Sequence, residues 1–522
     1  MMPHDLIRGR LTRGEGPWPW LAAGSVALSL LMLGALLVLL AGRGLGHFWP
    51  APVALVELED GHRLAGEAVK EARLPGVEDG GTHGRERLYR TANRDLDGGI
   101  WTWVALEAIA DVSHPDELVV LERRRWGDFI GRLLAVERDG RPLGRGEAAW
   151  PTLQARLDEL EALRDEQAGL RRETILPLAA RLASGPDAEA SRDLARANAR
   201  LRELRAEMGR DRLVLESADG RRLEQPLVEV LRAWRPNAMS PVEKLAAWGQ
   251  GVWRFLAEGP RAANTAGGVW PAIFGTVLMV LLMSVLVTPF GVLAAIYLNE
   301  VAHQGRLTRL VRIAVRNLAG VPSIVYGVFG LGIFVHGIGG ALDAWFFEET
   351  LPSPTFGTGG LLWASLTLAL LTLPVVIVAT EEGLARIPDH QREGALALGA
   401  TRLEMLARVV LPMAAPAMLT GVILAVARAA GEVAPLMLVG VAKLAPQVPV
   451  DGDFPFLHLE RKFMHLGYHI FDTAFHGGDV QAALPLVYAT ALLLVLVILV
   501  LNLTAIFLRH HLKVRHGALP RV

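Results

Sequence analysis

Six apolar runs in the chain are each long enough to form a membrane-spanning helix. Each exceeds the roughly 20 residues that an α-helix needs to cross a bilayer. The runs cover residues 18–42, 268–298, 313–342, 359–380, 411–441 and 481–508. The first run lacks the cleavage site of a signal peptide, so we expect it to remain as a span. The pattern predicts a mainly α, six-span helical membrane protein.

A long insert separates the first two spans and has a different pattern of residues. Residues 43–262 contain three alternating apolar and polar segments that lead into Asp-Gly pairs, at Asp60-Gly61, Asp139-Gly140 and Asp219-Gly220. Asp-Gly is a strong signal for the turn of a β-hairpin. We therefore expect β-hairpins in this insert, as part of an α+β domain.

Apolar residues at helical spacing occupy the middle of the insert. They predict an antiparallel helical hairpin at about residues 148–210, with a break at Ser184-Gly185-Pro186. The two apolar faces are Leu153, Leu157, Leu160 and Leu163, and Leu194, Ala197, Leu201, Leu204 and Met208. A flexible linker of mixed charge is the alternative interpretation of the insert.

Arginines gather in the segments that six spans would place on one side of the membrane. They occur at the N-terminus (residues 1–17), in the loops at 299–310 and 381–410, and around the C-terminal tail (residues 511–522). The positive-inside rule assigns such segments to the cytoplasm. Both termini are then cytoplasmic, and the insert at 43–262 lies on the outer side.

The composition excludes several kinds of site. The 522 residues include no cysteine, which excludes disulfides, thiolate metal sites and cysteine catalysis. None of the five lysines follows a glycine, so the chain has no Walker A loop for ATP hydrolysis. No group of histidines and carboxylates has convincing metal-ligand spacing. We expect a chain that is not an enzyme, binds no metal or cofactor directly and has no nucleic-acid partner.

A charged, amphipathic stretch at residues 381–412 lies between two predicted spans. Gly399 suits a turn with positive φ between two short helices. The second helix, at 402–410, carries Leu403, Leu406, Val409 and Val410, which we expect to pack under the spans. An ordinary amphipathic connector is the alternative. The residues that we single out in this stretch are Arg392, Glu393, Gly394, Ala395, Gly399, Ala400, Leu411 and Pro412.

Two pairs of polar residues lie in the predicted spans. Arg428 and Glu432 are four residues apart, so they share one helix face in the fifth span. Intramembrane charges usually face an aqueous path or the bundle interior, and an arginine there suits phosphate or another oxyanion. Arg316 and Asn317 offer donors at the cytoplasmic mouth of the third span, where glycines and a proline at 320–330 allow a kink. The alternatives are a structural ion pair for Arg428 and snorkelling for Arg316.

Four strings resemble the permease subunits of type I ABC importers, and more closely the PstA type of the bacterial phosphate-specific transport system. They are NLAGVPSIVYGVFG (317–330), LPVVIVATEEGLARIPDHQREGALALGATRLEMLARVVLP (373–412), LTGVILAVARAAGE (419–432) and APL (434–436). The likeness covers roughly residues 265–510, within a permease domain that we place at 263–510. Gly394 departs from the alanine of the family's loop, and Val433 departs from its common threonine.

The resemblance implies the permease subunit of an ATP-driven importer of inorganic phosphate in the bacterial inner membrane, with the insert in the periplasm. A similar permease of the PstC type would form the other half of the pathway. Two ATPase subunits of the PstB type would use ATP and contact the residues singled out in the 381–412 stretch. A periplasmic phosphate-binding protein of the PstS type would dock from outside. Arg428, Glu432, Arg316 and Asn317 would then serve the substrate pathway.

Other functions fit parts of the same pattern. A permease for another oxyanion, such as sulfate or molybdate, would use the same arginine. A membrane-anchored scaffold or signalling protein would recruit a partner through the outer helical hairpin, and it would bring down no ATPase. An ion-coupled secondary transporter would need broken helices in repeated halves, and the sequence shows no such repeat.

Overall fold

The computed structural model describes residues 17–73, 84–97, 99–261, 266–445, 447–452, 454–476 and 480–516. The chain divides into two compact units, residues 1–48 with 251–522 and residues 49–250. We name the first the membrane unit and the second the insert unit. Most of the two ends predicted to be cytoplasmic, residues 1–16 and 517–522, lies outside the described residues.

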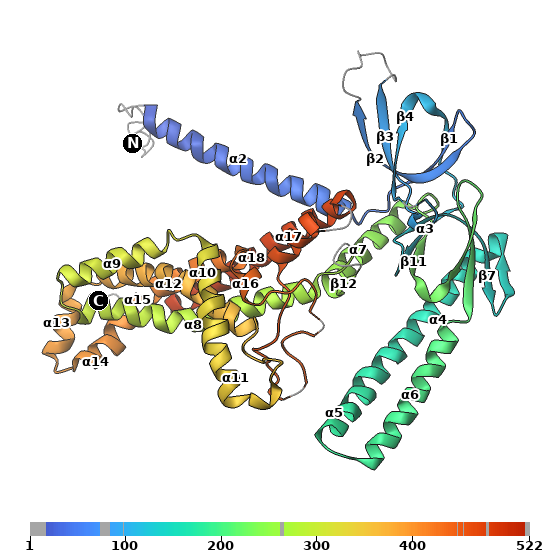
Figure 1. Ribbon diagram of the computed structural model, residues 1–522. Helices are drawn as coiled ribbons and strands as arrows, with labels where there is room; N and C mark the ends of the chain where they lie inside the picture. Colours follow the sequence, from blue (N-terminus) through green and yellow to red (C-terminus); the bar gives the residue numbers. More distant parts are fainter. Residues whose placement is uncertain are drawn as a thin grey trace. The chain divides into compact units, whose positions relative to one another are not determined.

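Six helices in the described ranges are long and apolar enough to cross a membrane (Figure 1). They are Trp18–Gly46, Trp270–Val301, Ser323–Phe346, Leu361–Ala385, Arg402–Gly431 and Ala483–His511. The prediction of a mainly helical, multi-pass membrane protein is therefore confirmed.

The membrane unit contains most of the helices. In chain order they are α2 (Pro17–Gly46), α8 (Trp270–Ile296) with a π-helical end (Tyr297–Val301), α9 (Arg306–Leu318), α10 (Ser323–Phe329), a π-helical segment (Gly330–Gly339), α11 (Gly340–Phe346), α12 (Leu361–Ala385), α13 (Asp389–Ala397), α14 (Arg402–Met405), a π-helical turn (Leu406–Val410), α15 (Leu411–Gly431), α16 (Leu436–Val439), α17 (Leu466–His476) and α18 (Val480–His516). The strands β12 (Pro260–Arg261) and β13 (Ala266–Gly267) pair before α8. Helix α7 (Pro241–Ala257) runs through the sequence boundary between the two units.

The core of the membrane unit lies between α8, α12 and α15. Glycines allow these helices to approach closely, as small residues commonly do in membrane proteins. A β-carbon built on Gly383 of α12 would lie 2.3 Å from the β-carbon of Ala417 on α15. One built on Gly421 of α15 would lie 2.8 Å from the β-carbon of Ala379 on α12. The contact between α12 and α15 therefore leaves no room for larger side chains at these positions.

The third predicted span, 313–342, is wrong at its start. Residues up to Leu318 belong to α9. The helix is interrupted at residues 319–322, and α10 begins at Ser323. Pro322 causes the break, because proline lacks a backbone N–H and disfavours helix in the residue before it. Figure 1 shows α9 and α11 running in different directions. The kink predicted from the glycines and proline at 320–330 is confirmed.

The fifth predicted span, 411–441, also needs correction. Helix α15 ends at Gly431, and Glu432 has extended backbone angles of φ −79° and ψ 130°. Arg428 and Glu432 therefore do not share one helix. At the other end, the helix predicted at 402–410 is not separate, because α14 continues through the π-helical turn into α15.

The insert unit is folded, so the flexible-linker interpretation is wrong for its described residues. Its strands are β1 (Val53–Leu58), β2 (Arg63–Arg73), β3 (Arg85–Arg90), β4 (Trp101–Ala105), β5 (Ile109–Ser113), β6 (Leu118–Arg123), β7 (Phe129–Arg138), β8 (Arg141–Arg145), β9 (Asp211–Glu216), β10 (Arg222–Pro226) and β11 (Val230–Trp234). Its helices are α3 (Arg94–Asp97), α4 (Ala149–Gly169) with a π-helical segment (Leu170–Ile175), α5 (Leu176–Ser184) and α6 (Ala188–Met208).

The three Asp-Gly pairs form the predicted hairpin turns. They connect β1 to β2, β7 to β8 and β9 to β10, each as an antiparallel pair. Gly61, Gly140 and Gly220 have φ angles of +83°, +76° and +83°. Glycine adopts these angles without the steric cost that a β-carbon brings.

The strands repeat one topology twice. The sheets have the orders β4-β3-β2-β1-β5 and β10-β9-β7-β6-β11, so each reads fourth, third, second, first, fifth strand. A short 3₁₀ turn precedes the last strand in both, at Leu106–Ala108 and Leu227–Glu229. The second copy differs by carrying β8 and the helices α4–α6 between its second and third strands. The insert unit is therefore two modules of the same strand order, one of them extended by a helical hairpin.

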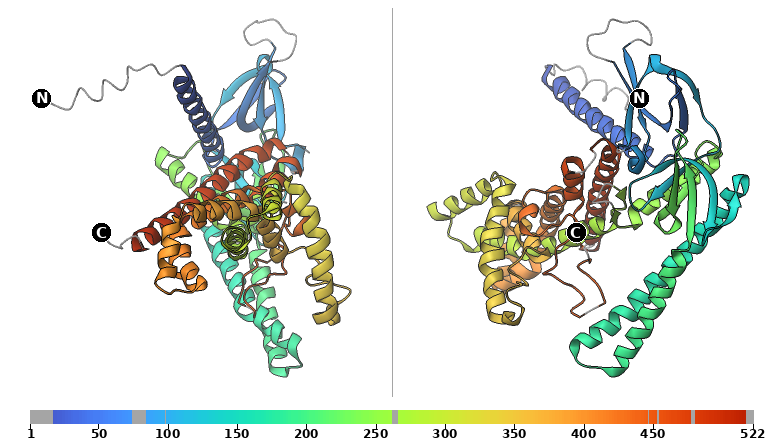
Figure 2. Two further views of the ribbon diagram at one scale, coloured as in Figure 1. Left: turned by 90° about the vertical axis from the view of Figure 1, so that its left-hand side faces the viewer. Right: turned by 45° about the vertical axis from the view of Figure 1, so that its right-hand side comes forward.

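The helical hairpin forms where leucine spacing predicts it. Figure 2 shows α5 and α6 side by side, and they are in contact. Leu153 and Leu160 on α4 and Leu204 and Met208 on α6 are buried. After the break, Asp187 restarts the helix by accepting hydrogen bonds from the backbone N–H groups of Glu189 and Ala190.

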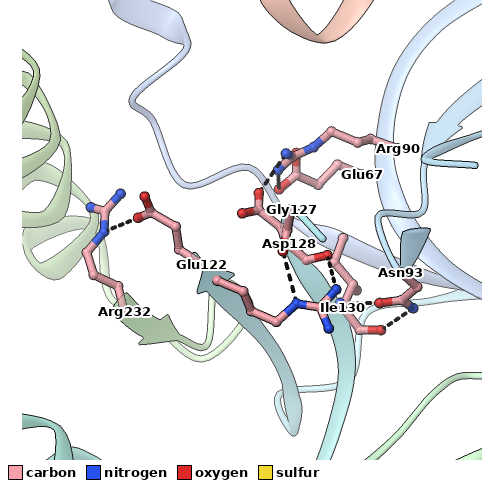
Figure 3. A network of polar contacts seen from close by, with 9 residues as sticks. Glu67, Arg90, Asn93, Glu122, Gly127, Asp128, Ile130 and Arg232 are labelled. Carbon is pink, nitrogen blue, oxygen red and sulfur yellow. Dashed lines mark hydrogen bonds and ion pairs between the residues drawn. The ribbon is translucent and has the colours of Figure 1, made fainter. Parts of the chain in front are cut away.

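A polar network joins the two modules of the insert unit (Figure 3). Arg90 of the first module pairs with Asp128 of the second at 2.8 Å and with Glu67 at 3.0 Å. Asn93 donates to the carbonyl of Ile130 and accepts from its N–H, both at 2.9 Å. These bonds fix the two modules to each other as one unit.

Candidate functional site

The 381–412 stretch forms a bent helical loop. Helix α13 ends at Ala397, and Gly399, two residues later, has a φ of +86°, the left-handed angle predicted for it. Ala400 N–H donates to the Ala395 carbonyl at 3.2 Å, and Gly399 N–H to the Leu396 carbonyl at 3.0 Å. This pair of bonds is the Schellman motif, which satisfies the last carbonyls of a helix.

Helix α14 begins with a capping box. Glu404 N–H donates to the Thr401 hydroxyl at 3.3 Å, and Thr401 N–H donates back to the Glu404 carboxylate at 3.0 Å. Each bond satisfies a backbone donor that a helix start leaves free. The bend between α13 and α14 is thus defined at both ends by local hydrogen bonds.

Arg392 on α13 points toward the ends of α8 and α12 and not into solvent. It pairs with Glu300 at 2.9 Å and donates to the carbonyls of Leu384 at 2.9 Å and Ile387 at 2.6 Å. Glu300 belongs to the π-helical end of α8. Arg392, which we expected to contact the ATPase, therefore holds α13 against α8 in this structure.

A second ion pair reinforces the base of the loop. Arg312 on α9 pairs with Glu381 near the end of α12 at 2.9 Å. The same guanidinium donates to the Leu298 carbonyl at the end of α8 at 2.8 Å. The middle of α9 is therefore linked to the ends of α8 and α12 directly beside the loop.

The solvent-exposed face of the loop carries apolar side chains. Leu398 is 91% exposed, Leu403 76% and Leu396 42%, and Glu393 and Gly394 are exposed beside them. Exposed apolar side chains in a cluster are typical of a surface that binds a partner. Sequence patterns missed Leu396 and Leu398, whose position next to Gly399 could have indicated them.

Leu403 corrects the predicted packing of the second helix. It was expected to pack under the spans, but it is exposed, and Met405 is buried instead. Leu406, Val409 and Val410 are at least partly buried, as predicted. The π-helical turn at Leu406–Val410 explains the difference, because its i→i+5 bonds change which side chains face the spans.

The other singled-out residues of the loop divide between its two faces. Ala395 is partly buried and packs on the apolar cluster that contains Met405 and Val410. Ala400 and Leu411 are half-buried, and Pro412 is exposed in the first turn of α15.

Arg428 and Glu432 form an ion pair at the end of α15. The Arg428 Nε and Glu432 Oε1 atoms are 3.5 Å apart, and the side chains are 33% and 21% exposed. A pair at this distance and exposure is held loosely compared with the buried pair of Arg392.

Arg316 and Asn317 lie on the last turn of α9 and are exposed. No hydrogen bond or ion pair joins them to Arg428 or Glu432 in the described part of the chain. Tyr326 on α10 donates its hydroxyl to the carbonyl of Leu318, the last residue of α9, at 2.8 Å. The structure thus pairs Arg428 with Glu432, and it joins neither Arg316 nor Asn317 to that pair by a bond in the described residues.

Comparison with known proteins assigns this arrangement to a family. The family model described as "Binding-protein-dependent transport system inner membrane component" matches residues 287–515. The "Phosphate transport system permease protein PstA 1" of Mycobacterium tuberculosis (strain ATCC 25618 / H37Rv) is 33% identical over 260 residues, which are 50% of this chain and 75% of the relative. The chain belongs to this family. The predicted resemblance to ABC importer permeases of the PstA type is therefore confirmed, and the chain is a transport subunit.

A second relative agrees with the family, and one solved structure is reported beside it. The "Phosphate transport system permease protein PstA" of Yersinia pestis is 34% identical over 244 residues, which are 46% of this chain and 72% of the relative. A chain of the inward-facing MetNI methionine ABC transporter has a TM-score of 0.34 and 17% identity, and the match covers 52% of this chain and 99% of that chain. The family match includes α13, α14 and Arg428 and leaves the insert unit outside.

Proposed function

We propose that the chain is the permease subunit of an ATP-driven importer of inorganic phosphate and forms half of its translocation pathway. The observation that carries the proposal is the 33% identity over 260 residues to permeases of phosphate transport systems. Family membership favours this function over a scaffold or signalling protein, since the family consists of transport components.

The proposed contact with the ATPase subunits is the solvent-exposed face of α13 and α14. Leu398, Leu403 and Leu396 would enter a groove on an ATPase of the PstB type, with Glu393 beside them. Arg392 would act behind this surface by transmitting its movement to Glu300 and α8. ATP is used by the partner subunits, which pull the loop when they close.

The proposed anion site is Arg428. Its guanidinium can give two parallel hydrogen bonds to a phosphate oxygen pair. Glu432 pairs with Arg428 while the pathway is empty, and the anion displaces the Glu432 carboxylate from the guanidinium. Arg316 and Asn317 are exposed near the break before α10, where they would meet the anion at the cytoplasmic mouth.

The proposed assembly follows the importer architecture. A PstC-type permease covers the other side of the pathway, and a PstS-type phosphate-binding protein delivers the substrate from the periplasm. In this arrangement the chain lies in the bacterial inner membrane, with both termini in the cytoplasm and residues 43–262 in the periplasm. The excess of arginine in the 299–310 and 381–410 loops supports this orientation.

Uptake of labelled anions tests the proposal. In a strain that lacks this chain, we expect loss of phosphate uptake and unchanged sulfate uptake, and plasmid expression should restore the loss. Loss of sulfate uptake alone would assign the permease to another oxyanion. Affinity purification in detergent should also bring down an ATPase subunit, and its absence would contradict the importer.

A further inference from the structure

One face of helix α7 is apolar and exposed. The helix follows the strands of the insert unit in the sequence and precedes α8 (Figure 1). Val242 is 77% exposed, Leu245 57% and Trp253 69%, and Ala246 is exposed between them. Together with Gly249 these residues follow the three- and four-residue spacing of a single helix face. We name the five residues the α7 stripe.

Local hydrogen bonds define the start of α7. Ser240 N–H donates to the Glu243 carboxylate at 2.7 Å, and Glu243 N–H donates back to the Ser240 hydroxyl at 3.3 Å. This capping box satisfies two backbone donors that the first turn of a helix leaves free. Val242 lies in that turn, so the cap keeps its side chain in line with the rest of the α7 stripe.

The opposite face of α7 is tied to the ends of two spans. A β-carbon on Gly251 would lie 3.3 Å from the β-carbon of Phe48, which follows α2. The rings of Phe255 and Phe48 have their centroids 5.3 Å apart. Val269, directly before α8, donates its N–H to the Phe255 carbonyl at 2.8 Å. The last turns of α7 therefore lie where α2 ends and α8 begins.

The ends of spans lie at the boundary between lipid and water. Tryptophan is enriched at this boundary, and Trp253 on α7 and Trp270 at the start of α8 are both exposed. An amphipathic helix at the boundary buries its apolar face between headgroups and acyl chains. We propose that α7 lies on the surface of the lipid bilayer, with the α7 stripe in contact with lipid.

The apolar surface of the neighbouring spans favours lipid as the occupant. Val38 on α2 is 73% exposed and Trp270 on α8 is 48% exposed, as expected of helices that face acyl chains. The α7 stripe extends this kind of surface by roughly 16 Å along α7, at 1.5 Å for each residue. Glu243 and Gln250 are exposed on one border of the stripe, where they stay in contact with water.

Four consecutive positions of α7 test the proposal. The chain has no cysteine, so Lys244→Cys, Leu245→Cys, Ala246→Cys and Ala247→Cys each give one site for a spin label. Positions 245 and 246 belong to the α7 stripe. Positions 244 and 247 lie on the other side of the helix, because successive residues are about 100° apart. The four variants are therefore matched in depth along the helix and differ in the face they label.

Electron spin resonance measures collisions of each label with oxygen, which enters lipid, and with a nickel chelate, which stays in water. The full-length chain, with the subunits that co-purify with it, is placed in nanodiscs of phosphatidylethanolamine and phosphatidylglycerol. We expect more collisions with oxygen than with nickel at positions 245 and 246. At positions 244 and 247 we expect the reverse.

A charge in the stripe supplies a second test. Trp253 is 69% exposed, so Trp253→Glu should leave folding unchanged. A carboxylate at this position opposes insertion of the stripe into lipid, and the label at position 246 should then collide more with nickel than with oxygen. The control is Leu176→Glu, the same charge at an exposed leucine of the insert unit, which should leave that label unchanged.

Three results would overturn the inference. Labels at 245 and 246 that collide mainly with nickel would place the α7 stripe in water. Labels there that collide with neither reagent would show that a protein covers the stripe instead of lipid. An unchanged label at position 246 in the Trp253→Glu variant would show that membrane contact does not depend on the stripe. None of these measurements requires transport, so each result holds whether or not phosphate is the substrate.

Discussion

Arg392 on α13 and Glu300 at the end of α8 form an ion pair of 2.9 Å across 92 residues of sequence. Their side chains are 15% and 10% exposed, so solvent screens the pair only weakly. Arg392 also donates to two backbone carbonyls, at Leu384 and Ile387. This group of bonds is a direct connection between the loop that we assign to ATPase binding and a helix of the membrane core.

Arg392→Ala tests that connection. Removing one partner of a largely buried pair leaves the other charge uncompensated, so we expect a loss of about 3 kcal/mol in the free energy of unfolding. We also expect loss of uptake, because α13 is no longer tied to α8. Thermal unfolding in detergent and labelled phosphate uptake measure the two effects. The control is Arg386→Ala, whose partner Glu382 is 4.0 Å away and exposed; equal effects of the two variants would contradict the connection.

Two glycines of the loop give a matched pair of substitutions. Gly399→Ala places a β-carbon at a φ of +86°, which costs about 1–2 kcal/mol. Gly394→Ala adds a β-carbon with no atom within 4 Å and favours the helix by about 0.5–1 kcal/mol. We expect reduced uptake for the first and normal uptake for the second. Gly399→Pro should abolish uptake while the protein still inserts, and normal uptake in that variant would refute the role of the bend.

Leu398 offers a test of the docking surface. It is 91% exposed, so Leu398→Asp should leave folding unchanged. If an ATPase covers this side chain, the buried charge weakens the complex and the ATPase no longer co-purifies. Glu393→Lys, at an exposed position of the same loop, should act in the same direction and abolish uptake. The control is Leu176→Asp, an equivalent change at an exposed leucine of the insert unit; ATPase recovery equal to that control would exclude Leu398 from the interface.

Acid should destabilise the region around α17. Burial lowers the pKa of His465 to about 3, and burial lowers that of His469 to about 4 although Asp472 opposes the shift. Both values lie below the ordinary 6.5. The unfolded chain therefore binds protons that the folded chain excludes as the pH falls below about 6.5. Stability is complete above that pH and is lost toward pH 4, by up to about 1.4 kcal/mol per group and pH unit.

The measurement is thermal unfolding in detergent between pH 4 and 7. His469→Leu removes one titrating group and should reduce the pH dependence. In the described structure neither ring nitrogen of His469 has a hydrogen-bond partner, so the substitution breaks no bond seen there. His62→Gln, at an exposed turn of the insert unit, should leave the slope unchanged. A slope that is the same in His469→Leu and in the unchanged protein would contradict the assignment.

Local signals predicted much of this fold, and long-range pairing accounts for what they missed. The Asp-Gly turns and Gly399 depend on the conformations open to a few consecutive residues, so their sequence identifies them. The inward direction of Arg392 depends on Glu300, 92 residues away, which no local pattern reveals. The repeated strand order is likewise a property of pairing between distant strands. Hydropathy located the apolar runs but did not predict where the helices within them begin and end. Pro322 precedes the start of α10, and Glu432 follows the end of α15.

Arg428→Gln tests the candidate anion site. Glutamine keeps hydrogen-bond donors but lacks the positive charge and the paired N–H donors of the guanidinium, which together hold an oxyanion. We therefore expect uptake to fall to background. Arg428 is partly exposed and its pair with Glu432 spans 3.5 Å, so folding and ATPase co-purification should be retained. Arg428→Lys keeps the positive charge without the paired N–H donors of the guanidinium, and it should retain some uptake with a raised KM for phosphate. If Arg428→Gln loses the ATPase instead, the arginine is structural, because removal of an anion ligand does not disturb a contact made by α13 and α14.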